Sequence, residues 1–141
     1  MKIMFDTERL ILRAPEPADL DDWCSVSDES RADVEEFLLR SIREFEQFGF
    51  SMGTLVSKET DEFVGRAGIY HWFAPDVRQD LEIGCYISER QRNKGYGTEL
   101  TRAMFDWGFT YLQVDRLIGL SDIALSNSHA VLERSCAKWN T

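Results

Sequence analysis

Residues 92–97 combine positive charge with glycine in a way that suits an anionic ligand. They read Arg92-Asn93-Lys94-Gly95-Tyr96-Gly97, and Thr98 then begins a helical pattern. The free N–H groups of a helix's first turn and the helix dipole both favour a phosphate at this place. Glycine lets the backbone approach such a ligand closely. The plainer alternative is a solvated basic turn that caps the helix.

The spacing of the glycines separates this loop from two common nucleotide-binding motifs. The dinucleotide fingerprint GxGxxG fails because Leu100 stands where its last glycine would be. The ATP loop GxxxxGK[ST] fails because Lys94 precedes its glycine instead of following it. The pattern Arg/Gln-x-x-Gly-x-Gly/Ala does fit residues 92–97, although a pattern of six residues also arises by chance.

Length and composition predict one soluble globular domain over residues 1–141, since 43% of the residues are hydrophobic and 29% are charged. A net charge of −9 argues against nonspecific nucleic-acid binding and suits a cationic partner. No apolar run approaches the roughly 20 residues of a membrane span, and no signal peptide is visible. Three cysteines without a CxxC pair predict reduced thiols in a cytoplasmic protein, with no metal site.

Hydrophobic periodicity predicts the order β-α-α-β-β-β-α-β-α, which indicates an α/β fold with a mixed sheet and helices on its faces. Helical patterns begin near Pro17, run from Asp33 to a terminating Gly49, and follow the glycine loop. The segment "NSHAVLERSCAKW" is predicted to form a final helix. The predicted strands are 9–13, 50–57, 62–72, 81–88 and 116–121, and the polar turn 58–61 predicts a hairpin.

The stretch "EIGCYISERQRNKGYGTELTRAMFDWGF" resembles the acetyl-CoA-binding core of the GNAT family of N-acetyltransferases. The resemblance is closest to the branch that acetylates ribosomal-protein amino termini and spermidine. "TERLILRAPEPADLDDW" is similar to that branch's first strand and helix, and "SNSHAVLERS" to its last helix. The family fold implies a mixed, mostly antiparallel central sheet with helices on both faces. It also implies acetyl-CoA as co-substrate, with no metal.

The resemblance assigns cofactor contacts to matching positions. Main-chain N–H groups of residues 92–97, helped by Lys94, would bind the pyrophosphate, and Thr98 could add a hydroxyl contact. The pantetheine arm would pair with Cys85, Tyr86 and Ile87. A main-chain N–H near Ile87 would polarise the thioester carbonyl as an oxyanion donor. The family's cofactor-binding asparagine falls on Leu125, with Asn127 displaced from it, beside Ser128.

Amine acetylation needs a group that accepts the amine's proton. Glu82 stands where the family often has such a carboxylate, and its apolar neighbours would raise its pKa. The alternative is an outward-facing glutamate on a half-exposed strand. His71 is the second candidate base, with a structural role at a strand end as its alternative. Ser128 is the candidate acid for the departing thiolate, unless it is only a hydroxyl at the start of a helix. For Cys85 and Cys136, buried packing is favoured over a covalent acyl intermediate.

The carboxyl-terminal segment departs from the family pattern. The family continues after the last helix with two strands that wall the acyl pocket, whereas this sequence stops at Thr141. The resemblance therefore implies a truncated chain or a partner molecule that supplies the wall. An open edge on strand 116–121, together with Trp139, predicts a homodimer. Two functions follow: acetyl transfer to a primary amine in a ternary complex, or a non-catalytic acetyl-CoA-binding module.

Overall fold

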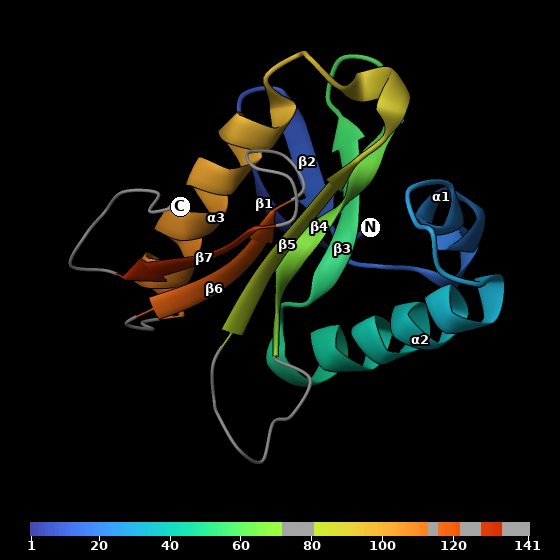
Figure 1. The fold of residues 1–141 in the computed structure, drawn as a ribbon, viewed down its shortest axis with the longest axis horizontal. Coiled ribbons are helices and arrows are strands. Elements are labelled where there is room, and N and C mark those ends of the chain that lie inside the picture. The colour runs from blue at the N-terminus through green and yellow to red at the C-terminus, as the bar shows by residue number, and fades with distance from the viewer. Residues whose placement is uncertain (72–80, 113–115, 122–127, 134–141) are drawn as a thin grey trace.

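A seven-stranded sheet forms the centre of the molecule (Figure 1). The computed structural model describes residues 1–71, 81–112, 116–121 and 128–133. The strands follow one another across the sheet in chain order, and all neighbours are antiparallel except β5 and β6, which are parallel. The strands are β1 Ile3–Asp6, β2 Leu10–Arg13, β3 Met52–Ser57, β4 Phe63–His71, β5 Leu81–Ile87, β6 Arg116–Ser121 and β7 Ser128–Glu133.

Helices cover both faces of this sheet. Helix α3 (Tyr96–Tyr111) connects β5 to the parallel strand β6 and packs on one face through Leu100 and Met104. Helices α1 (Leu20–Ser25) and α2 (Arg31–Phe48) lie against the other face through Trp23, Val34 and Leu38 (Figure 1). A sheet with apolar residues on both faces needs such a cover on each side. The predicted fold, a mixed and mostly antiparallel sheet between helices, is therefore confirmed.

Local signals in the sequence account for the ends of α2. The Ser30 hydroxyl accepts a hydrogen bond from the Asp33 N–H at 3.1 Å, which caps the first turn. Gly49 ends the helix in the left-handed region, with φ of 82°. Only glycine takes that conformation without a steric cost, so the predicted helix end is confirmed.

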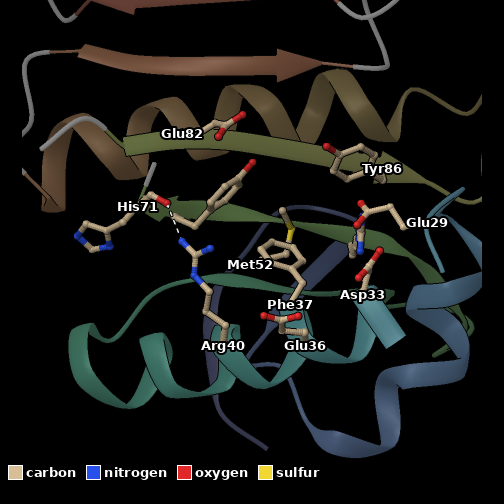
Figure 2. A pocket seen from close by; sticks show the side chains of 11 residues that line it. Glu29, Asp33, Glu36, Phe37, Arg40, Met52, His71, Glu82 and Tyr86 are labelled. Carbon is tan, nitrogen blue, oxygen red and sulfur yellow. Dashed lines mark hydrogen bonds between the residues drawn. The ribbon is translucent and has the colours of Figure 1, made fainter. Parts of the chain in front are cut away.

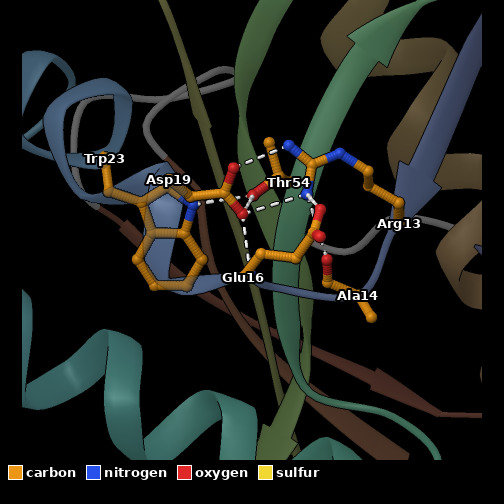
Figure 3. A network of polar contacts seen from close by, with 6 residues as sticks. All are labelled: Arg13, Ala14, Glu16, Asp19, Trp23 and Thr54. Atoms are coloured by element: carbon orange, nitrogen blue, oxygen red, sulfur yellow. Dashed lines mark hydrogen bonds and ion pairs between the residues drawn. The ribbon is translucent and has the colours of Figure 1, made fainter. Parts of the chain in front are cut away.

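A buried polar network fastens α1 to the sheet (Figure 3). The Asp19 carboxylate, in the 3₁₀ turn Pro17–Asp19, accepts hydrogen bonds from both Arg13 terminal nitrogens at 2.6 and 3.0 Å. The Thr54 hydroxyl of β3 donates to the same carboxylate at 2.8 Å and accepts from the Trp23 indole N–H at 2.9 Å. Trp23, which is fully buried, is thereby fixed in orientation as well as in position.

The sequence prediction misses two strands. β1 is absent from it, yet β1 pairs with β2 at the sheet edge. The predicted final helix is wrong over Ser128–Glu133, because these residues form β7, paired antiparallel with β6. An unpaired β6 edge would leave its backbone groups without partners, and a six-residue apolar segment does not distinguish helix from strand by periodicity. The open β6 edge that favoured a homodimer is therefore covered, and the homodimer stays a prediction. Trp139 lies outside the described residues.

Candidate active site

The glycine loop forms a turn at the start of α3 whose geometry suits an anion. Gly95 precedes the helix with φ of 81°, and Asn93 also lies in the left-handed region, with φ of 64°. The first bond within the helix runs from the Glu99 N–H to the Gly95 carbonyl at 3.1 Å. The N–H groups of residues 96–98 therefore have no acceptor inside the helix and point outward at its positive end.

A cavity of about 370 Å³ opens directly beside this turn. Arg92 contributes a cation to its wall. Such a cavity, with glycine backbone, free helix N–H groups and a guanidinium, fits a pyrophosphate. The residues lining it are Ile87, Gln91, Arg92, Asn93, Gly95, Tyr96, Gly97 and Thr98.

Polar side chains hold the glycine loop in place. Lys94 is not among the residues that line the cavity, and its Nζ donates to the Gln91 side-chain oxygen at 3.0 Å. Gln91 is buried and in turn donates to Glu62 at 3.2 Å. Arg92 is held from the other side, since its Nε donates to the Ile87 carbonyl at 3.3 Å. Gln91 was not predicted, and its position within a basic, polar stretch gave no signal of burial.

Glu99 anchors the first turn of α3 to the start of β2. Its carboxylate accepts hydrogen bonds from the Thr7 hydroxyl at 2.5 Å, the Arg9 N–H at 3.0 Å and the Arg9 Nε at 2.7 Å. The Arg9 guanidinium also lies 4.5 Å from the centroid of the Tyr96 ring. Burial alone acts to raise the pKa of Glu99, but the hydrogen bonds from Thr7 and Arg9 outweigh burial and lower it.

Ile87, the last residue of β5, lies beyond the described pairing of β5 with β6. Pairing between the two strands runs from Leu81–Leu117 to Cys85–Ser121. The Ser88 N–H donates to the Val64 carbonyl on the opposite side, at 2.8 Å. Because backbone groups alternate in direction along a strand, the N–H and carbonyl of Ile87 point toward the β6 side, beyond its last recorded pair. No described residue of β6 pairs with Ile87, so this main-chain N–H is a candidate donor for a ligand bound between the strands.

A second cavity, of about 410 Å³, lies on the other face of the sheet, between β4, β5 and α2 (Figure 2). Glu82 and Tyr86 reach it from β5, and Tyr70 from β4. Glu29, Asp33 and Glu36 contribute exposed carboxylates from α2 and the segment before it. The remaining lining residues are Phe37, Arg40, Met52, Arg66 and His71.

Glu82 is a buried carboxylate in this cavity, with 6% of its surface exposed. It lies directly opposite Tyr70 in the β4–β5 pairing, so the two side chains share one face of the sheet. Burial above all raises the pKa of Tyr70, and the charge of Glu82 and a hydrogen bond between the two side chains raise it further. The Tyr70 hydroxyl thus stays protonated and donates to the carboxylate.

His71 stands at the end of β4, at the far side of the cavity from Tyr86 (Figure 2). Its ring stacks against Phe48 and Phe50, with centroid distances of 4.4 and 5.6 Å. Its Nδ1 is buried and has no hydrogen-bond partner among the described residues. The Arg40 guanidinium donates to the His71 carbonyl at 3.4 Å. The aromatic packing supports the structural role for His71.

Cys85, another predicted site residue, lines neither cavity. Cys85 is buried on the α3 face with Leu100 and Met104. Ser128 lies on β7 opposite Ser121, which removes it from the start of a helix. Asn127 and Cys136 lie outside the described residues. Within the described ranges, no group of three or more histidine, cysteine or acidic side chains is placed to hold a metal, and no helix is long and apolar enough to cross a membrane.

Comparison with known proteins places the chain in a family. Residues 9–137 match the model of the acetyltransferase (GNAT) domain. The protein YkkB of Bacillus subtilis (strain 168) is 30% identical over 103 residues, which are 66% of this chain and 58% of that protein. The chain therefore belongs to the GNAT acetyltransferase family, and it spans 58% of the length of that relative.

Solved structures show the same fold. An acetyltransferase from Agrobacterium tumefaciens str. C58 superposes with a TM-score of 0.70 at 25% identity, covering 82% of this chain and 71% of that one. The spermidine/spermine N-acetyltransferase SpeG of Vibrio cholerae gives a TM-score of 0.59 at 18% identity, covering 79% and 67%. The predicted family is confirmed.

Proposed function

We propose that this protein transfers the acetyl group of acetyl-CoA to a primary amine, with both substrates bound at the same time. The observation that carries the proposal is the position of β5 between the two cavities. Ile87 lines the cavity at the glycine turn, while Glu82 and Tyr86 line the cavity on the opposite face. Acetyl-CoA supplies a thioester, whose carbonyl carbon accepts the amine nitrogen.

The residues on the cofactor side bind the pyrophosphate of acetyl-CoA and polarise its thioester carbonyl. The N–H groups at the start of α3, together with Arg92, hold the pyrophosphate. The Ile87 N–H, which lies beyond the described β5–β6 pairing, faces the place where the pantetheine arm would continue the sheet. A donor fixed there stabilises negative charge that develops on the carbonyl oxygen during attack.

The residues on the acceptor side handle the proton of the amine. Free alkylamines are protonated near neutral pH, so the nucleophile must lose a proton before or during attack. Glu82 accepts this proton, directly or through water, and Tyr70 holds the carboxylate in place. A carbon–nitrogen bond forms and the carbon–sulfur bond breaks. The nitrogen then loses a second proton, which ends on the sulfur, so that coenzyme A leaves as the thiol. The exposed carboxylates at the cavity rim favour a cationic amine over a neutral molecule.

A thiol-release assay with acetyl-CoA tests the proposal. The acceptors are peptides with free amino termini, polyamines and small amines, each beside its N-acetylated counterpart as a control. We expect release with at least one primary amine and none with its acetylated counterpart. Calorimetry run in parallel measures acetyl-CoA binding. Binding without release for any amine would overturn the enzymatic proposal and favour the acetyl-CoA-binding module.

A further inference from the structure

Arg66 is a buried charge in the acceptor cavity whose donors are partly unused. Only 4% of its surface is exposed. Its Nε and Nη1 have no hydrogen-bond partner among the residues that the structure describes. Burial lowers the pKa of Arg66, yet a guanidinium stays charged in proteins. A buried and unpaired charge is costly, which points to a partner that the described residues do not provide.

Aromatic rings fix the guanidinium of Arg66 in one orientation. Its central carbon lies 4.8 Å from the ring centroid of Tyr86 and 5.6 Å from those of Trp23 and Phe37. Rings attract the face of a guanidinium, whereas its N–H groups point outward in its plane. Trp23 is itself held by the hydrogen bond to Thr54 (Figure 3). Arg66 is thus preorganised, and its Nε and Nη1 donors, themselves buried, have no hydrogen-bond partner among the described residues.

We propose that Arg66 binds a carboxylate of the acceptor, so that the preferred acceptors are amines that also carry a carboxylate, such as amino acids. The inference rests on the proposed function, because it names the substrate class of the same site. A planar carboxylate accepts two parallel hydrogen bonds from a guanidinium, which adds geometric selection to charge.

The β4–β5 register places the Arg66 guanidinium and the Glu82 carboxylate on the same face of the sheet, in the acceptor cavity. Arg66 lies opposite Tyr86, and Tyr70 lies opposite Glu82, so both pairs face the acceptor cavity. Glu82 and Tyr86 are four positions apart on β5, which is about 13 Å of strand. The side chains of Glu82 and Arg66 are long, so their charged groups can lie closer together than the backbone positions do. A zwitterion would lie between them with its ammonium group toward Glu82 and its carboxylate toward Arg66.

The acidic residues at the rim of the cavity do not take the place of the ligand carboxylate beside Arg66. Glu29 acts on Arg66 through space and favours its charged form, but no hydrogen bond from Arg66 Nε or Nη1 reaches it. Glu29, Asp33 and Glu36 are exposed at the rim, where water screens their charge. Arg40, the other guanidinium of the cavity, already lies 3.4 Å from Glu44 Oε1. Arg66 is therefore the anion-binding group that the cavity offers at depth.

A kinetic test compares amino acids with their amides, which differ only in the carboxylate. For the wild type we expect kcat/KM to be about tenfold or more higher for the acid, a difference of roughly 1.4 kcal/mol. Arg66→Met should remove this preference by raising KM for the acid, so that kcat/KM for the acid and for the amide differ by less than about twofold in the variant. Arg66→Lys, which keeps the charge but not the fork, should retain part of the preference. An equal loss for acid and amide would show a merely structural role and overturn the proposal.

A binding test measures the preference for a carboxylate without relying on catalytic turnover. N-acetylglycine and N-acetylphenylalanine, each beside its amide, are titrated into the wild type and Arg66→Met by calorimetry. We expect the acids to bind the wild type more tightly than the amides, and this difference to vanish in the variant. Amine turnover without any preference for acids in the wild type would overturn the Arg66 proposal and leave the proposed function standing. Selective acid binding without turnover of any amine would uphold the Arg66 site and overturn the proposed function.

Discussion

Glu82 is the buried carboxylate of the acceptor cavity, and its proposed task is proton acceptance. Glu82→Gln keeps the size and much of the hydrogen bonding to Tyr70 but cannot take up the proton. General bases contribute typically about 10²–10⁴-fold, so we expect kcat to fall within that range while acetyl-CoA affinity is unchanged. The loss should shrink as pH rises, because more amine then arrives already neutral. Steady-state kinetics across pH measures both effects.

His71→Gln is the matched control for Glu82→Gln. Its ring stacks on Phe48 and Phe50, so the substitution should affect packing more than turnover. If His71→Gln loses turnover and Glu82→Gln does not, the base has been assigned to the wrong residue. If neither variant loses turnover, the amine sheds its proton to water, and catalysis rests on positioning and on the Ile87 N–H.

Gly95 has a backbone conformation that favours glycine, and it also lies in the turn that is proposed to bind the cofactor. Its φ of 81° costs a β-branched residue about 1–2 kcal/mol, and a side chain there would also crowd the anion-binding turn. We expect Gly95→Val to weaken acetyl-CoA binding about tenfold or more in calorimetry. Gly49→Val is the matched control, since Gly49 has φ of 82° and open space around it, far from the cavity. Both variants should lose stability, and only Gly95→Val should lose affinity; equal affinities would contradict the assigned turn.

At the scale of elements, the attachment of α3 to β2 depends on the charge of Glu99. Its pKa is lowered in the folded state, so its stabilising effect is fully present above the unfolded value of about 4.3. This effect is lost as pH falls through the lower folded pKa. We expect Glu99→Gln to reduce the free energy of unfolding by about 1–3 kcal/mol at pH 7, with the difference from wild type vanishing in acid.

Chemical denaturation at a series of pH values measures this difference. Glu35→Gln is the control, because Glu35 is an exposed residue of α2 for which the described structure gives no side-chain hydrogen bond. Its stability should follow that of the wild type at each pH. A Glu99→Gln protein as stable as wild type at pH 7 would mean that the three hydrogen bonds to Thr7 and Arg9 add nothing to α3's attachment.

The elements that the sequence predicts well are those with strong local signals. Helix α2 has a serine cap and a terminating glycine, and the glycine loop before α3 is recognisable from its own residues. β7 was predicted as a helix because its six residues carry no decisive period, and only pairing with β6 determines their conformation. The sequence analysis also did not identify Arg66 and Tyr70 as site residues, for a similar reason. Their place in the acceptor cavity depends on the β4–β5 register and on where α2 packs, which are non-local.

At the scale of the whole molecule, the sheet separates the site into two compartments that meet at β5. The glycine turn and α3 serve one compartment, and α1, α2 and the acidic rim serve the other. The chain's net charge of −9 favours the approach of a cationic amine, and in the proposed function the donors at the start of α3 hold the anionic cofactor against it. Under the proposed function, two separate compartments let acetyl-CoA and the amine bind at the same time, which predicts a particular kinetic pattern.

We expect sequential kinetics, with double-reciprocal plots at several amine concentrations that intersect instead of running parallel. Direct attack needs no acyl-enzyme, and Cys85 is 2% exposed on the α3 face and lines neither cavity. Cys85→Ala should therefore keep kcat within about twofold of wild type, while losing roughly 1 kcal/mol of stability through lost packing. Parallel plots, or a Cys85→Ala protein that is folded but inactive, would instead indicate a covalent acyl intermediate on the protein.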